Sequence, residues 1–120
     1  AVLNHINHAR MMGEEINVPD LMASFQYAVV DVLTSHAVEA AKNLGYDKVA
    51  IAGGVASNSA LRAEMKEACE KAGLKFYYPS PIFCTDNAAM IGVAGYYEYI
   101  NGTRSGWDLN AVPNLKLGER

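Results

Sequence analysis

Residues 48–58 read KVAIAGGVASN, an apolar run that ends in two glycines and a short polar turn. The segment VAIA within it is apolar on both faces, which predicts a central strand covered on each side. Gly53 and Gly54 allow a sharp turn and let a ligand approach bare backbone, and Ser57 or Asn58 is suited to cap a following helix. Strand, glycine turn and helix N-terminus together form a common phosphate-binding arrangement. An ordinary turn without a ligand fits equally well, because a lone glycine pair is a weak signal.

Helices are predicted on both sides of this stretch. After a first helix over residues 1–12, Pro19 begins a long helix that Gly45 ends as a C-cap. Another helix follows from about Ser59, and residues 74–78 read as a second strand. Because strand, helix and strand follow at this spacing, we expect a right-handed βαβ unit with parallel strands.

The helical periodicity also assigns core and surface positions. The apolar stripe predicted for the long helix consists of Leu21, Phe25, Ala28, Val29, Val32, Leu33, Ala40 and Leu44. His36 falls close to this stripe and is expected to be packed or at its boundary. The core face predicted for the next helix consists of Leu61, Met65, Ala68, Cys69 and Ala72. Its charged face includes Arg62 and an i,i+4 pair of Glu67 and Lys71.

A last helix is predicted from about residue 88 to residue 100, and it is apolar nearly all round. Such a helix is expected to be buried on most sides. Gly92 and Gly95 lower its helix propensity, which is consistent with another backbone packing closely there. Residues 1–104 are therefore assigned to one α/β subdomain and residues 105–120 to an irregular tail.

Composition narrows the class of protein. The 120 residues are 51% hydrophobic and 19% charged with a net charge of −3, which predicts a globular domain without a general basic surface. No apolar run approaches the roughly 20 residues of a membrane span, and no signal peptide is visible. Two cysteines make no disulfide framework, so a reducing cytoplasm is the expected compartment. The residues from Ala1 onward have the pattern of the middle of a helix and no capping residue precedes them, so we expect the chain to be part of a longer protein.

The sequence CTDN at residues 84–87 is the second chemical candidate. Asp86 fits either an N-cap or a ligand of a divalent metal at the rim of a nucleotide cleft. Cys84 precedes a helix N-terminus, but no histidine base is near it in sequence to support a thiol nucleophile. His5 and His8 share a helix face, and solvated side chains explain them better than a metal site without a third ligand.

These segments together resemble a known family. AGGVASN at 52–58 with Leu61-Arg62, FCTDNAAMI at 83–91 and ASFQ at 23–26 are similar to the C-terminal part of the tRNA N6-adenosine threonylcarbamoyltransferase family. That family was formerly named O-sialoglycoprotein endopeptidase or glycoprotease. The resemblance implies an actin/Hsp70/sugar-kinase-like (ASKHA) fold of the α/β class, a short parallel sheet with flanking helices in this part.

The resemblance also implies site residues. Gly53, Gly54 and Asn58 match the positions that bind the adenylate ligand, and Asp86 matches a metal ligand. Two further metal ligands of the family are histidines in an H-x-x-x-H motif, which this sequence lacks. The implied metal is divalent, iron(II) foremost, with zinc or magnesium as alternatives.

The implied reaction moves the threonylcarbamoyl group from threonylcarbamoyl-adenylate to the N6 amine of the adenine next to the tRNA anticodon. The implied partners are tRNA, the adenylate and other subunits of the threonylcarbamoyladenosine synthesis complex, with no membrane. Alternatives are a metal-dependent endopeptidase, a sugar- or acetate-kinase-like phosphotransferase, and a non-catalytic partner of an active subunit. The 120 residues alone are expected to be inactive, because half of the cleft would be missing.

Overall fold

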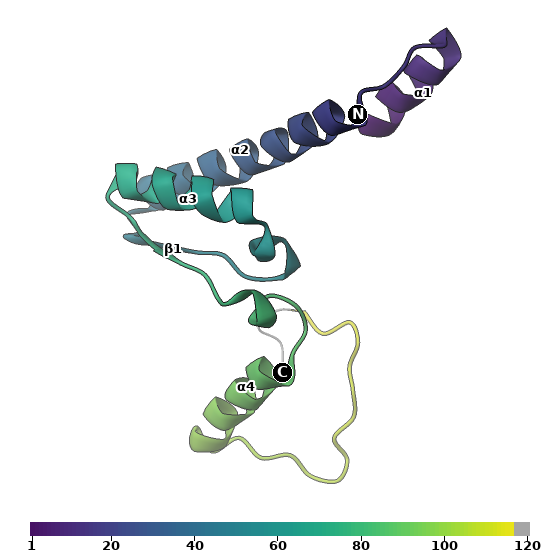
Figure 1. Cartoon of the computed structure of the whole chain (residues 1–120). Coiled ribbons are helices and arrows are strands. Elements are labelled where there is room, and N and C mark those ends of the chain that lie inside the picture. The colour runs from purple at the N-terminus through teal and green to yellow at the C-terminus, as the bar shows by residue number, and fades with distance from the viewer. Residues whose placement is uncertain (117–120) are drawn as a thin grey trace. The chain divides into compact units, whose positions relative to one another are not determined.

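The computed structural model describes residues 1–116, which fall into two compact units (Figure 1). The first unit is Ala1–Thr85, and the second begins at Asp86. The predicted division at 104/105 falls inside the second unit and stays a prediction; residues 117–120 of the predicted tail lie outside the described residues. The helices are α1 (Val2–Met12), α2 (Val18–Leu44), α3 (Ser59–Ala72) and α4 (Ala88–Ile100), the 3-10 turns η1 (Gly54–Ser57) and η2 (Pro81–Phe83), and the strands β1 (Lys48–Ala50) and β2 (Lys75–Tyr77).

Local capping chemistry sets the ends of α2. Asn17 caps its start by accepting a hydrogen bond from the backbone N–H of Asp20 at 3.3 Å. Gly45 ends the helix in the left-handed conformation with φ 72°, which confirms the predicted C-cap. Both ends of this long helix therefore lie within one residue of their predicted positions.

The sheet pairs β1 with β2 in parallel, with Val49 opposite Phe76, so the predicted βαβ unit with parallel strands is confirmed, while its right-handed crossover stays a prediction. Val49 is buried against α2 and α3, whereas Ala50 and Tyr77 on the other face are exposed. The prediction of a strand covered on both sides is thus wrong for the described residues. The reason is that α2 and α3 both pack on the same face of the sheet.

The core of the first unit lies between α2, α3 and β1, where α2 and α3 run side by side in Figure 1. Its buried members are Val30, Ala41, Val49, Leu61, Met65 and Cys69. The predicted α3 face is confirmed at Leu61, Met65 and Cys69, which are buried, while Ala68 and Ala72 are half-buried. Burial raises the pKa of the Cys69 thiol.

The opposite face of α3 carries ion pairs as predicted. Lys71 Nζ lies 2.6 Å from Glu67 Oε1, one helical turn away. The hydrogen bond from Lys71, together with its charge, lowers the pKa of Glu67. Both side chains are largely exposed, so solvent screens the pair and it contributes little to stability.

The predicted stripe on α2 is largely wrong. The helix buries Val30, Thr34 and Ala41, whereas Phe25 and Leu33 from the predicted stripe are 50% and 42% exposed. His36 is exposed as well, contrary to expectation. Because α2 is apolar on more than one face, periodicity alone does not indicate which face meets α3.

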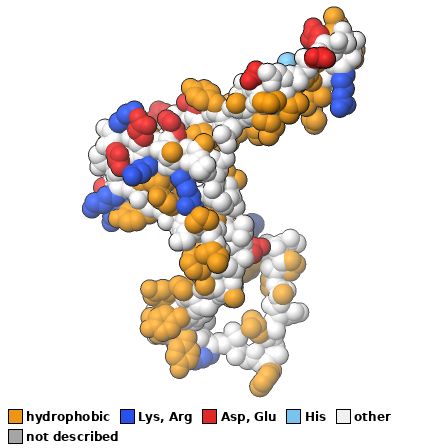
Figure 2. Space-filling model, in the orientation of Figure 1, with side chains coloured by type: hydrophobic (Ala, Val, Ile, Leu, Met, Phe, Trp, Pro, Cys, Tyr) orange, Lys and Arg blue, Asp and Glu red, His pale blue; other side chains and the backbone are white. Residues whose placement is uncertain are grey.

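The fourth helix also differs from prediction. None of the α4 residues is buried, and Figure 2 shows hydrophobic side chains gathered on its surface. A Cβ built on Gly92 or Gly95 would meet nothing within 4 Å, so no described backbone packs there. The apolar sequence predicts a covered helix, but the described residues provide no cover for it. Among the described residues, no helix combines enough length and apolar character to cross a membrane.

Candidate functional site

The turn after β1 is the first part of the candidate site. Gly53 has φ 84° and ψ 176°, a backbone region essentially restricted to glycine. The chain then forms η1 before α3 starts at Ser59, so the predicted turn between strand and helix is a 3-10 turn and the predicted helix start is confirmed. Gly53 is therefore needed for the backbone itself, whatever it binds.

Gly54 differs from Gly53 in an informative way. Its φ is not positive, and a Cβ built on it would meet nothing within 4 Å. Neither backbone conformation nor packing within the described residues requires glycine at this position. What glycine does provide there is an exposed, bare backbone that a ligand can approach closely.

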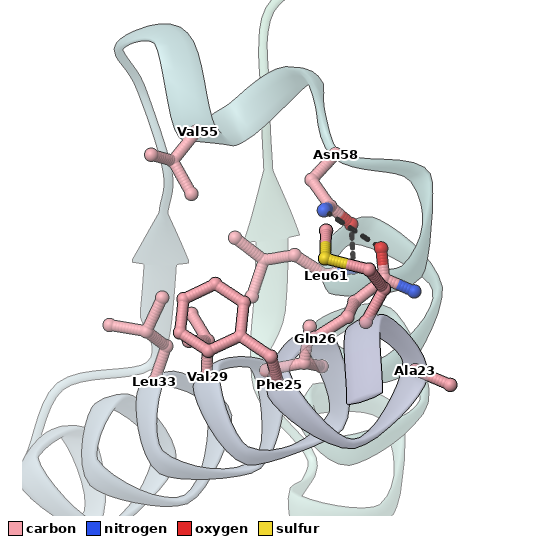
Figure 3. A pocket seen from close by; sticks show the side chains of 10 residues that line it. Ala23, Phe25, Gln26, Val29, Leu33, Val55, Asn58 and Leu61 are labelled. Carbon is pink, nitrogen blue, oxygen red and sulfur yellow. Dashed lines mark hydrogen bonds between the residues drawn. The ribbon is translucent and has the colours of Figure 1, made fainter. Parts of the chain in front are cut away.

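Asn58 joins this turn to two helices (Figure 3). Its Oδ1 accepts a hydrogen bond from Leu61 N–H at 3.0 Å, which caps α3 and confirms that Asn58 is the capping residue. Its Nδ2 donates to Oε1 of Gln26 on α2 at 3.3 Å. The oxygen thus serves the fold, and the amide nitrogen faces another polar side chain.

A groove of about 540 Å³ lies between this turn and α2. In Figure 3, Val55 of the turn and Phe25 of α2 project into the same space, with Asn58 and Gln26 at one end. The lining residues are Met22, Ala23, Phe25, Gln26, Val29, Val30, Leu33, Val55, Asn58 and Leu61. A largely apolar wall with a few convergent polar groups is typical of small-molecule sites.

Arg62 lies beneath the turn, although its charge predicts a solvent-facing position. The residue is partly buried, and its Nε–H donates to the backbone carbonyl of Ala56. Its Nη2 donates to the carbonyl of Pro79 at 2.9 Å and to Sγ of Cys84 at 3.1 Å. Cys84 itself is buried, and its Sγ lies 3.6 Å from the carbonyl oxygen of Ser80.

The cap of α4 is Asn87 and not Asp86. Oδ1 of Asn87 accepts a hydrogen bond from Met90 N–H at 3.0 Å, so the capping interpretation of Asp86 is wrong. Both residues have side chains suited to an N-cap, and the sequence alone does not separate them. The Asp86 carboxylate is exposed at the start of the second unit.

No group of three His, Cys, Asp or Glu side chains within residues 1–116 is placed to hold a metal ion. His5 and His8 are both exposed, as the interpretation as solvated side chains predicts. The Asp86 carboxylate offers hard oxygen donors, which suit iron(II), zinc and magnesium chemically. The chemistry of Asp86 is that of one possible ligand in this chain, and the metal itself stays a prediction.

The structure brings Gly53, Gly54 and Asn58 together in one turn beside the groove. Asp86 belongs to the other unit. The roles of these residues toward an adenylate and a metal stay predictions. Sequence reasoning missed Arg62 as a contact residue and gave Gln26 no role; the only signal was that both lie in segments that carry the family resemblance.

Comparison with known proteins agrees with that resemblance. The model of the family described as tRNA N6-adenosine threonylcarbamoyltransferase matches residues 1–93. Curated relatives with that name from Clostridium botulinum strain Hall and Clostridium perfringens strain 13 are 57% and 58% identical over all 120 residues. The chain spans 35% of the length of each of these relatives. The chain belongs to the tRNA N6-adenosine threonylcarbamoyltransferase family.

Proposed function

We propose that this chain forms part of an enzyme that transfers a threonylcarbamoyl group from threonylcarbamoyl-adenylate to the N6 amine of the adenine next to the tRNA anticodon. The names of the relatives state the transferase and its tRNA adenosine substrate. "Complete enzyme" here means a protein of the relatives' length that carries these 120 residues. Within it, the chain would contribute to the α/β core of an ASKHA-type fold in the cytoplasm.

The reaction is an acyl transfer. The N6 amine attacks the carbamoyl carbonyl carbon, a C–N bond forms, and the C–O bond to the adenylate phosphate breaks. AMP leaves with the bonding electron pair, and the amine loses one proton. The chain's own contribution would be to hold the adenylate so that its carbonyl faces the amine.

The bare backbone at Gly54 is the observation that supports this proposal most. A glycine that the fold itself does not require stands beside a groove with Asn58 and Gln26 at one end. An adenylate needs apolar contact for its base, polar contacts for its ribose and close backbone approach for its phosphate. The groove, the amide side chains and the glycine turn offer these three kinds of contact.

Asp86 would hold the divalent metal, iron(II) with zinc or magnesium as alternatives, through its carboxylate. When bound, such a metal orients the ligand and stabilises developing negative charge. The exposed carboxylate does not cap α4, a task that Asn87 performs, which leaves it available for this role. Other ligands would come from outside this chain, as would other subunits of the synthesis complex.

The test is tRNA modification by the complete enzyme. Purified enzyme, unmodified tRNA and threonylcarbamoyl-adenylate are incubated, and threonylcarbamoyladenosine is measured by mass spectrometry. We expect product with the unchanged enzyme and a loss on the order of 100-fold with Asp86→Ala. Asp108→Ala serves as a control that removes another exposed carboxylate. Full activity of Asp86→Ala would reject the metal-ligand role, and absence of product with the unchanged enzyme would reject the proposed function.

A further inference from the structure

Arg62 on α3 connects two segments of the first unit through its guanidinium group. Its guanidinium group bonds to the carbonyl of Ala56 in η1, and to Pro79 and Cys84 in the segment after β2. Its Cζ also lies 4.7 Å from the centre of the Tyr78 ring. One side chain thereby connects the glycine turn to the segment that leads into CTDN.

The contacts span long stretches of sequence. The partners of Arg62 are 6, 17 and 22 residues away along the chain. Ala56 precedes Asn58 by two residues, and Cys84 precedes Asp86 by two residues. Arg62 therefore bonds to the backbone at Ala56, just before Asn58, and to the side chain of Cys84, just before Asp86.

The chemistry of these contacts requires an arginine. A planar guanidinium directs several N–H groups in fixed directions, whereas a lysine ammonium is a compact charge on a flexible stem. Within the described residues Arg62 forms no ion pair with a carboxylate, unlike Lys66 and Lys71 on the same helix. Its acceptors are neutral carbonyls and a thiol, so the contacts depend on the geometry of the fork and not on charge pairing.

We propose that Arg62 is a positioning residue that holds the Gly53–Asn58 turn and the 79–85 loop in one arrangement required for threonylcarbamoyl transfer. This inference rests on the proposed function. Arg62 acts through the backbone carbonyls of Ala56 and Pro79 and the thiol of Cys84, and it needs no direct contact with the substrate. Misplacing catalytic groups by about 1 Å costs on the order of 100-fold in rate, so loosening these loops should lower kcat strongly.

Arg104 provides a matched control. Its guanidinium also lies over a tyrosine ring, 4.1 Å from the centre of Tyr99, and donates to the carbonyls of Tyr99 and Thr103. These partners are only 5 and 1 residues away, so these contacts of Arg104 stay next to the C-terminal end of α4. Removing Arg104 deletes the same kind of interaction without separating two loops.

The experiment compares Arg62→Met, Arg62→Lys and Arg104→Met in the complete enzyme, using hydrogen exchange of backbone amides and steady-state kinetics with threonylcarbamoyl-adenylate. Ala56 N–H and Cys84 N–H, bonded to Gly53 and Pro81 at 3.0 and 3.1 Å, are the exchange reporters of the two loops. We expect both Arg62 variants to raise exchange at both reporters by about tenfold or more, while amides near Met65 exchange as before. Their kcat should fall roughly 10- to 100-fold, and Arg104→Met should change neither quantity.

Three results would overturn the inference. The first is unchanged exchange at either loop, and the second is an equal rise at all amides, which indicates a purely structural role. The third is loosened loops with kcat within twofold of the unchanged enzyme. If Arg62→Met does not fold, Arg62→Lys carries the same comparison. The exchange result does not depend on catalysis, so a failure of the proposed function appears separately, as absence of product from the unchanged enzyme.

Discussion

The side-chain amide of Asn58 donates a hydrogen bond to Oε1 of Gln26 at 3.3 Å, across 32 residues of sequence. The oxygen of the same amide caps α3 through Leu61 N–H. The Oδ1 and Nδ2 atoms of this side chain thus have different roles. The oxygen stabilises a helix, and the nitrogen lies at the end of the groove, where it can be shared between Gln26 and a ligand.

Substitution of Asn58 can separate these roles. Asn58→Asp keeps an oxygen that caps α3, because Asp is as good an N-cap as Asn, so the unfolding free energy should stay within about 0.5 kcal/mol. Asn58→Ala loses the cap and should cost about 1 kcal/mol. Both variants lose the amide donor and should raise KM for threonylcarbamoyl-adenylate. The increase should be larger for Asn58→Asp, because the carboxylate charge repels the phosphate. Unchanged KM in Asn58→Asp would show that Asn58 serves only the helix.

Gln26 should affect the ligand and not the fold. Gln26 is exposed on α2, so Gln26→Leu is expected to change the unfolding free energy by less than about 0.5 kcal/mol. Losing the contact that orients Asn58 should raise KM for the adenylate roughly 2- to 10-fold, the range of one neutral hydrogen bond. Glu39→Leu, an exposed position on the same helix, is the control. Equal KM values in the two variants would remove Gln26 from the site.

The buried thiol of Cys69 predicts a pH dependence of stability. Burial raises its pKa above the ordinary value of 9.0, so the folded chain holds the proton more tightly than the unfolded chain does. The stability linked to this thiol is complete below pH 9.0 and is lost as pH rises above it. Urea unfolding of the unchanged protein and of Cys69→Ala between pH 7 and 10 should show the stability difference shrinking above pH 9. A difference that stays constant would contradict this.

The sequence predicts which segments of this chain form helices and strands better than it predicts which faces of those segments are buried. Proline, asparagine and glycine at helix ends act locally, so the ends of α2 follow from residues that touch only their own neighbours. Burial is decided by what packs on a face. Phe25 and Leu33 on α2 and the large hydrophobic residues of α4, such as Ile91, resemble core residues in type, yet the described chain leaves them exposed.

In the candidate site, too, local features could be predicted from the sequence and contacts between distant residues could not. The glycine turn and Asn58 could be predicted, because φ preferences and capping are properties of a few consecutive residues. Asp86 and Asn87 have similar capping chemistry, so only the structure assigns the cap to Asn87. The partners of Arg62 lie up to 22 residues away, and no local pattern indicates that its charge would be turned inward.

If the turn at Gly54 receives an adenylate, then Gly53→Ala and Gly54→Ala should have different effects in the complete enzyme. Gly53→Ala should destabilise the fold by about 1 kcal/mol or more, because its φ of 84° strains any other residue. Gly54→Ala meets no atom of the described chain, so the unfolding free energy should stay within about 0.5 kcal/mol.

The deciding measurement is kcat/KM for threonylcarbamoyl-adenylate in Gly54→Ala. The added methyl group should collide with the bound adenylate and lower kcat/KM by about tenfold or more, at unchanged stability. A Gly54→Ala enzyme that is as stable and as active as the unchanged enzyme would show that no adenylate binds at this turn.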